Sequence, residues 1–296
     1  MTGQVDLHHE PVLLEAVRDL LVTGGGWYVD ATVGNGGHAA AILDQRDDIR
    51  LLGADQDPAA LRRARLVLSR FGDRVRLTRE NFRTIDQWVP EECRPVRGIL
   101  FDLGVSSPQL DDPARGFSYQ VDAPLDMRMD PDGERTAFRL VNMASGPELT
   151  RILREYGEER WASRIAQFIV DARRREPIRT TGQLVEVIKA AIPASARRTG
   201  GHPARRTFQA LRMWVNQELE CLEEGLEGAH RLLAPGGRVA VIAFHSLEDR
   251  LVKQRFRAWA LAGSGHVLTR KPVGPTATET AANPRSRTAK LRVYEA

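Results

Sequence analysis

The sequence predicts a doubly wound α/β fold interrupted by an all-helical insert of roughly a hundred residues. Three observations lead to this prediction. Short apolar runs alternate with helical patterns over the first 110 residues and again after residue 206. A glycine-rich turn follows the first of these runs. Between residues 111 and 206 only helical patterns appear, and such a segment is too long for a loop within a compact domain.

The first segment is expected to supply four strands of a parallel sheet. Asp57-Pro58 begins the helix between the second and third strands, because an N-cap acceptor precedes a proline at the first helical position. The apolar face of this helix runs to Phe71, and Gly72 ends it. The four strands are predicted at residues 27–33, 51–54, 75–77 and 96–103.

The insert is expected to contain helices at residues 147–156 and 161–172 and a third that begins with a Thr180/Gln183 capping box. The α/β pattern then resumes. We therefore assign residues 1–110 and 207–296 to one domain and residues 111–206 to the insert. The predicted elements after the insert are one long helix (208–233), a strand (239–244), a helix (251–261), a loop (274–286) and two last strands (266–269, 290–294).

Composition excludes several classes of protein. With 42% hydrophobic and 28% charged residues, the chain has the balance of a globular protein, and no apolar run could span a bilayer. Its two cysteines, Cys93 and Cys221, cannot form a disulfide framework or a cysteine zinc site, which favours the cytoplasm. Apart from the adjacent His8 and His9, the seven histidines do not pair at ligand spacing. We therefore expect no metal and no membrane.

Positive charge is concentrated in two tracts, although the net charge is only +4. Residues 171–212 hold ten basic and three acidic residues, and residues 250–296 hold ten basic and two acidic residues. Arginine-rich tracts suit a polyanionic partner, while a solvated basic surface remains the alternative. Aromatic residues are only 6% of the chain and do not alternate along a strand, so a base-stacking platform is not expected.

A glycine-rich turn with a distant acid predicts a nucleoside-bearing cofactor. Gly34, Gly36 and Gly37 follow the first strand, and Asp55 ends the second, where an acid can bind ribose hydroxyls. Asp30 precedes the glycines. Its charge suits the cationic amino-acid end of S-adenosylmethionine better than a pyrophosphate. The alternative is a tight turn without a ligand.

A second constellation follows the fourth strand. Asp102 lies where open α/β sheets bind ligands. Asp102 and the carbonyl groups of Ser106, Ser107 and Pro108 could accept the N–H groups of an exocyclic amine, so that its nitrogen can attack a methyl group. The alternative is a strand-end turn capped by serine.

His245 directly follows the fifth strand. It could polarise a group or relay a proton, but a lone histidine also commonly orients its neighbours. No Ser/His/Asp order or nucleophile elbow surrounds it, which argues against a hydrolase.

The basic end of the insert supplies three candidate RNA contacts, Arg205, Arg206 and Arg212. These arginines could bind phosphates. The alternative is a helix N-cap at Thr207 followed by exposed arginines.

Seven segments taken together resemble the MraW family of ribosomal RNA small subunit methyltransferases (RsmH), over nearly the whole chain. The segment between Leu261 and Asn283 is shorter than in the family, which puts substrate contacts near the C-terminus in doubt. The matching segments are residues 30–38, 102–111, 115–118, 124–129, 156–159, 202–212 and 244–250.

The resemblance implies a class I S-adenosylmethionine-dependent methyltransferase with a Rossmann-like sheet and a helical domain that recognises RNA. The implied reaction is N4-methylation of a cytidine in the decoding region of 16S rRNA, by direct transfer to the exocyclic amine. The implied partner is 16S rRNA within the small ribosomal subunit, and the resemblance does not decide whether the chain forms a homodimer. The implied cofactor contacts are Gly36, Gly37, His38, Asp55, Phe82, Asp102 and Gln109.

Independently of the resemblance, the residues themselves indicate four of these seven contacts: Gly36, Gly37, Asp55 and Asp102. Two alternatives from other classes remain. An NAD-dependent oxidoreductase would use the same glycine turn and Asp55 but bind NAD. A non-catalytic RNA-binding assembly factor would share the basic tracts yet tolerate loss of Gly36 or Asp55.

Overall fold

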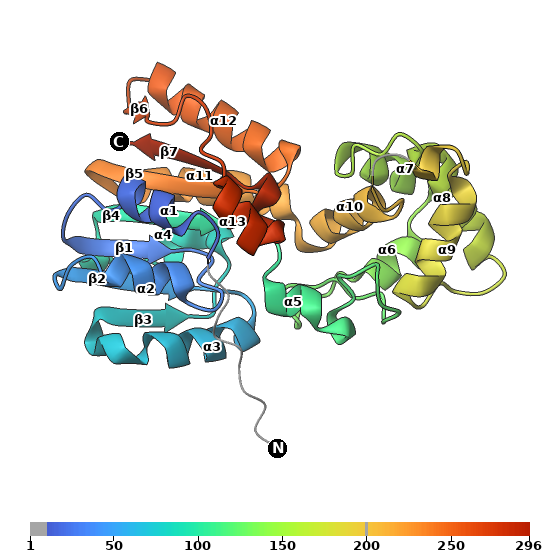
Figure 1. Cartoon of the computed structure of the whole chain (residues 1–296), viewed down its shortest axis with the longest axis horizontal. Coiled ribbons are helices and arrows are strands. Elements are labelled where there is room, and N and C mark those ends of the chain that lie inside the picture. Colours follow the sequence, from blue (N-terminus) through green and yellow to red (C-terminus); the bar gives the residue numbers. More distant parts are fainter. Residues whose placement is uncertain (1–10, 199–200) are drawn as a thin grey trace. The chain divides into compact units, whose positions relative to one another are not determined.

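A computed structural model describes residues 11–198 and 201–296 of the chain (Figure 1). The chain divides into two compact units. The first comprises the described residues up to Gly104 together with Leu219–Ala296, and the second is Val105–Glu218. His8 and His9, considered above as a metal-binding pair, lie outside the described residues.

The first unit is built on a seven-stranded sheet in the order β3-β2-β1-β4-β5-β7-β6. Its first five strands pair in parallel, which confirms the α/β prediction, whereas β7 pairs antiparallel with both β5 and β6. The strands are β1 (Gly26–Asp30), β2 (Ile49–Ala54), β3 (Val75–Thr78), β4 (Val96–Asp102), β5 (Leu233–Ala243), β6 (His266–Val267) and β7 (Lys290–Glu295).

Helices cover both faces of this sheet, so the central strands are buried on both sides, as parallel strands require. Successive residues of one strand enter different cores: Tyr28 packs with one set of helices and Val29 with the other. One face is covered by α1 (Leu14–Leu21), α2 (Gly37–Leu43) and α3 (Pro58–Leu68). The other is covered by α4 (Ile85–Trp88), α11 (Glu218–Leu232) and α12 (Ser246–Leu261).

The second unit has its own apolar core, made by helices. The expected Thr180/Gln183 capping box is present: Gln183 N–H donates to Thr180 Oγ1 (3.3 Å), and Thr180 N–H donates to Gln183 Oε1 (3.1 Å). The helices are α5 (Ser107–Asp111), α6 (Ala137–Met143), α7 (Gly146–Glu155), α8 (Ala162–Arg173), α9 (Thr181–Ala191) and α10 (Arg205–Asn216). No strand occurs in the described part of this unit.

The prediction of a single long helix over residues 208–233 is wrong. The chain forms α10 and α11, and they are separated by Gln217, whose φ of 50° is left-handed. A left-handed residue cannot continue a right-handed helix. Thr207, considered above as an alternative N-cap, is a buried residue inside α10, and Ala204 occupies the N-cap position.

The unit boundaries in the structure also differ from the expected ones at residues 110 and 207. They fall after Gly104 and after Glu218. Residues 207–218 belong to the helical unit because α10 packs against α6 and α7.

Two further local expectations are corrected. The predicted loop at 274–286 contains helix α13 (Ala277–Ala282), capped by Thr276, and a following 3₁₀ turn, Pro284–Thr288. Helix α3 ends at Leu68, before Gly72, and a 3₁₀ segment, Ser69–Arg74, continues the chain. Within the described residues, every helix is too short or too polar to cross a bilayer.

Replacing Gly98 with alanine should destabilise the first unit. An added Cβ would lie 2.6 Å from the Tyr28 ring and 3.0 Å from Leu21 Cδ1, in a buried part of β4. Overpacking of this kind costs roughly 1–3 kcal/mol, so thermal denaturation should show a lower melting temperature. Gly24→Ala is the matched control, because no atom lies within 4 Å of its added Cβ. Equal melting temperatures for both variants would contradict this packing.

Candidate functional site

Three carboxylates stand at one edge of the sheet of the first unit. Asp30 ends β1, Asp102 ends β4, and Asp55 directly follows β2. These three strands are parallel neighbours, so their carboxyl ends meet at the same edge. The strand order reverses between β1 and β4, which is the point where open α/β sheets bind ligands.

Backbone amide groups hold two of these acids. Thr32 N–H donates to Asp30 Oδ1 (3.2 Å), while Gly34 N–H and Asp57 N–H donate to the two oxygens of Asp55 (3.0 and 2.8 Å). Burial nevertheless raises the pKa of Asp30 to about 7 and that of Asp55 to about 6. Asp55 therefore ties the glycine turn to the end of β2.

The glycine turn uses conformations and spaces that only glycine allows easily. Gly34 and Gly36 have φ values of 51° and 87°, in the left-handed region. Gly36 is the N-cap of α2, and a Cβ on Gly37 would lie 2.4 Å from Pro11 Cγ. The tight turn predicted after the first strand is therefore present, and its Gly36 and Gly37 pack closely against Leu68 and Pro11.

His38, which is buried, and Asp102, whose side chain is 28% exposed, form a pair that is incompletely hydrogen-bonded. His38 Nε2 lies 3.6 Å from Asp102 Oδ2, the His38 ring has a hydrogen bond with the backbone of Val12, and Asp102 Oδ1 has no hydrogen-bond partner among the described residues. Burial, together with the charges of Asp30 and Glu248, raises the pKa of Asp102 to about 8. Burial lowers the pKa of His38 to about 4. At neutral pH both groups are therefore largely uncharged.

Buried polar atoms without partners are uncommon and call for an explanation. Here they lie beside the buried Asp30 and the partly buried Asp55 at the edge of the sheet. A ligand with cationic groups and hydroxyl donors would satisfy these atoms and favour the ionised carboxylates. The residues present therefore fit a cofactor such as S-adenosylmethionine, which carries a sulfonium, an ammonium and a ribose.

Glu248 was not identified as a site residue from the sequence. It is 2% exposed, and its Oε2 accepts the N–H groups of Phe244 (2.8 Å) and His245 (3.3 Å). His245 in turn caps α12: Nδ1 accepts Glu248 N–H at 3.4 Å, and Nε2 lies 3.1 Å from Glu248 Oε1. The His-x-x-Glu spacing before a helix, a variant of the capping box, was the available signal. In the structure His245 therefore caps the first turn of α12.

Phe82 lies in a 3₁₀ turn, Phe82–Thr84, shortly after β3. Its ring packs edge-on against Phe101, with the ring centroids 5.5 Å apart. Helix α11 approaches closely at Gly225, where a Cβ would lie 2.9 Å from Phe82. The ring is only partly buried, so it can offer an apolar wall to an adenine.

The other predicted contacts to cofactor and target base belong to the second unit. Ser107 and Pro108 begin helix α5, and Ser106 is its N-cap. Ser106 N–H donates to Gln109 Oε1 (3.0 Å), and Gln109 is buried. The structure therefore shows Gln109 closing the first turn of α5.

Two of the three predicted RNA-binding arginines are exposed on α10. Arg205 is exposed, and so is Arg206, which donates to the carbonyl oxygen of Glu158 (2.8 Å). Arg212 makes two hydrogen bonds to Glu218, both 2.8 Å long, and both side chains are largely buried. A role in binding phosphate is thus better supported for Arg205 and Arg206 than for Arg212.

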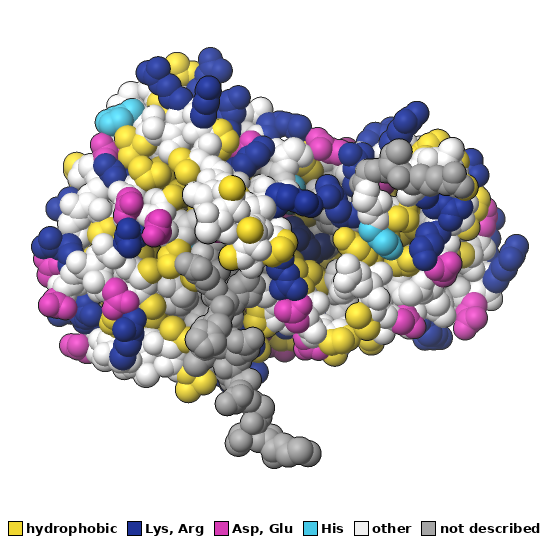
Figure 2. All heavy atoms as spheres, in the orientation of Figure 1, with side chains coloured by type: hydrophobic (Ala, Val, Ile, Leu, Met, Phe, Trp, Pro, Cys, Tyr) yellow, Lys and Arg dark blue, Asp and Glu magenta, His cyan; other side chains and the backbone are white. Residues whose placement is uncertain are grey.

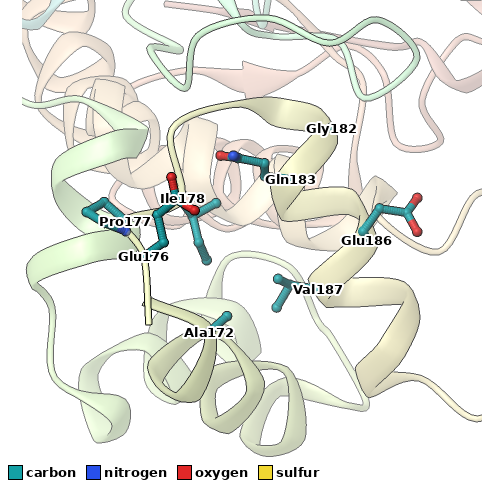
Figure 3. Close-up of a pocket in the computed structure, with 8 residues that line it drawn as sticks. All are labelled: Ala172, Glu176, Pro177, Ile178, Gly182, Gln183, Glu186 and Val187. Carbon is teal, nitrogen blue, oxygen red and sulfur yellow. The ribbon is translucent and has the colours of Figure 1, made fainter. Parts of the chain in front are cut away.

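A hollow of about 420 Å³ lies between the end of α8 and α9 (Figure 3). Ala172, Ile178 and Val187 contribute apolar surface, and Glu176 and Glu186 add carboxylates. Two acids beside an apolar wall do not suit a phosphate. This hollow is therefore not part of the candidate site.

The family model and the two relatives described here agree on one family. The model of the MraW methylase family matches residues 6–296. The chain is 58% identical to ribosomal RNA small subunit methyltransferase H of Symbiobacterium thermophilum, over 96% of this chain and 95% of that protein. It is 53% identical to the protein of the same name from Heliobacterium modesticaldum, over 97% and 98%. A crystal structure of an rRNA methylase from Streptococcus thermophilus aligns more loosely, with a TM-score of 0.41 and 14% identity over 95% of this chain and 92% of that one.

Proposed function

Because this chain belongs to the MraW methylase family, we propose that it methylates N4 of a cytidine in the decoding region of 16S rRNA. S-adenosylmethionine is the methyl donor of this class I fold. The observation that carries the proposal is the acidic edge formed by the buried Asp30 and the partly buried Asp55 and Asp102, with raised pKa values, beside His38. The names of the two relatives support ribosomal RNA as the substrate.

Each residue at this edge has a proposed task in holding the cofactor. Asp55 accepts the ribose hydroxyls, Asp30 faces the ammonium group, and Phe82 packs against the adenine. Gly36, Gly37 and His38 form the turn over which the cofactor lies, and Gln109 is assigned to the same set by family resemblance. When bound, S-adenosylmethionine supplies a methyl group that its sulfonium already activates, so no covalent enzyme intermediate is needed.

Asp102 is proposed to orient the target amine. As a carboxylate it accepts an N–H of the exocyclic amine, which directs the nitrogen lone pair toward the methyl group. Glu248 and His245 hold the backbone between β5 and α12 in place. The N–H groups of Phe244 and His245 donate hydrogen bonds to Glu248, and His245 caps α12. A base stacked within folded RNA must leave its stack to reach such a site.

The test is transfer of radiolabelled methyl from S-adenosylmethionine to 16S rRNA, supplied free and within small subunits that lack the modification. The RNA is then digested to nucleosides. We expect N4-methylcytidine as the labelled product. A different labelled nucleoside would refute the proposed target, and a chain that binds cofactor but labels neither RNA would refute the proposed substrate.

The second unit is proposed to bind RNA through the exposed end of α10. Replacing Arg205 and Arg206 with glutamine should weaken rRNA binding and make the slope of log affinity against log salt shallower by roughly 1.5, because two phosphate contacts are lost. Binding at several salt concentrations measures both effects. Arg50→Gln with Arg97→Gln is the charge-matched control, since both residues are exposed near the amino ends of β2 and β4, away from the candidate edge. An unchanged slope in the α10 variant would count against this role.

A further inference from the structure

Helix α12 has its acidic and basic residues on different sides. Its two acids, Glu248 and Asp249, are both engaged toward the protein: Glu248 is buried, and Asp249 binds Arg292 (2.6 Å) and Lys290 (3.2 Å). Among the helix's basic residues, Arg255 is paired with Glu223 and Glu227 of α11. The remaining basic residues are exposed.

These remaining residues, Arg250, Lys253 and Arg257, form the outer stripe of α12. The buried face comprises Val252, Phe256 and Trp259. With 3.6 residues per turn, positions 250 and 257 fall on the side of the helix opposite this face, and position 253 lies between them along the axis. Figure 2 shows Lys and Arg side chains gathered over α12, at the top of the view.

Lys253 and Arg257 have no ion pair or hydrogen bond with any residue the structure describes. Other arginines of this unit are paired with acids, as in Arg83–Glu224 and Arg238–Glu295. Lys253 and Arg257 are exposed cations without counterions among the described residues, and such cations are suited to an external polyanion.

The stripe begins at the candidate site. Ser246, the first residue of α12, follows β5 at the same edge of the sheet as Asp102, because β4 and β5 are parallel. Arg250 lies about one turn into the helix, and Arg257 lies about 10 Å farther along the axis. A chain of phosphates that passes the edge of the sheet can therefore continue along this side of α12.

We propose that the outer stripe of α12 is a second RNA-binding surface, which contacts the phosphates of the RNA that flanks the target nucleotide. This proposal rests on the proposed function for the identity of the polyanion. The contact is electrostatic and is made to phosphates, which carry no sequence information. It belongs to the methyltransferase unit and is separate from the arginines of α10.

The test measures the salt dependence of binding to unmethylated 16S rRNA, with the full chain and its Lys253→Gln/Arg257→Gln variant. We expect the slope of log affinity against log salt to become shallower by roughly 1.5 in the variant. Affinity for S-adenosylmethionine should be unchanged, because neither residue belongs to the acidic edge. The Arg50→Gln/Arg97→Gln control should keep the parental slope. The charge-retaining variant Lys253→Arg/Arg257→Lys should also keep it.

Three outcomes would overturn the proposal. One is a parental slope in the Lys253→Gln/Arg257→Gln variant. Another is an equally large change of slope in the Arg50→Gln/Arg97→Gln control. The third is a change of slope that appears with small subunits but not with free rRNA, which would indicate that the stripe binds a ribosomal protein. Methyl transfer by the parental chain is a separate readout: if rRNA is bound with the expected slopes but never methylated, the proposed function fails while this surface stands.

Discussion

Replacing Asp102 with asparagine is expected to abolish methyl transfer and, at the same time, to stabilise the protein without cofactor. Activity should fall at least about a thousandfold, because an amide lacks the charge that the carboxylate offers to the reacting amine and the cofactor. Binding of rRNA should persist, since the basic surfaces on α10 and α12 are unaltered. Radiolabelled methyl transfer and filter binding measure the two effects separately.

The gain in stability follows from the sign of the pKa shift. The pKa of Asp102 is raised from 3.8 to about 8, mainly by burial and then by the charges of Asp30 and Glu248. Between these two values the folded protein holds a proton that the unfolded chain does not, so the free energy of unfolding decreases as pH rises. Asparagine does not titrate, so the free energy of unfolding of the variant does not decrease in this way as pH rises. Its melting temperature should exceed that of the parent by more at pH 8 than at pH 5.

Asp249→Asn is a control for which the opposite change in melting temperature is expected. Burial alone would raise the pKa of Asp249, but hydrogen bonds from Arg292 and Lys290 outweigh it and lower the pKa. Its replacement should therefore reduce the melting temperature. If Asp102→Asn were destabilising as well, the pKa assignment would be wrong. If it retained methyl transfer, Asp102 would have no part in the mechanism.

The position of the acidic edge could be predicted from the sequence because it depends on local signals. Asp30, Asp55 and Asp102 each follow an apolar run, and the carboxyl ends of parallel strands meet at one edge. The glycine turn is equally local, since the left-handed φ of Gly34 and Gly36 requires residues of that type.

The features that depend on tertiary packing could not be predicted in this way. Apolar spacing runs without interruption from α10 into α11, and nothing in it shows that Gln217 takes a left-handed conformation. The burial of Glu248, which makes it a neighbour of Asp102, depends on how α12 packs against the sheet. His38 entered only through the family resemblance, because a histidine after a glycine turn has no distinctive signal of its own.

Cofactor affinity is expected to increase with pH between about 6 and 8.5. In the protein without cofactor the pKa values of Asp30 and Asp102 are about 7 and 8, so both acids are largely protonated at the lower limit. A bound cation favours the carboxylates, and therefore binding must release protons. Each acid that has to ionise contributes up to about tenfold in affinity per pH unit below its pKa.

The charged neighbours of these acids support the same direction. Asp102 faces Asp30, Glu248 and His38, and Asp30 faces Asp55. His38 has a pKa of about 4 and stays neutral throughout this range, so it supplies no compensating positive charge. The clustered acids therefore remain difficult to ionise until a ligand brings a cation among them.

The comparison of S-adenosylmethionine with S-adenosylhomocysteine isolates the effect of the sulfonium. Both ligands share the ammonium, carboxylate and adenosine groups, but only the methyl donor carries the additional positive charge. Calorimetric titrations in buffers of different ionisation enthalpy should show greater proton release for the donor and a steeper rise of its affinity with pH. Asp102→Asn should reduce this difference, because it removes the acid with the higher pKa. Identical pH profiles for the two ligands would mean that the acidic edge does not distinguish the sulfonium. The expected difference would mean that the edge favours the methyl donor over the demethylated product and so promotes release of the product.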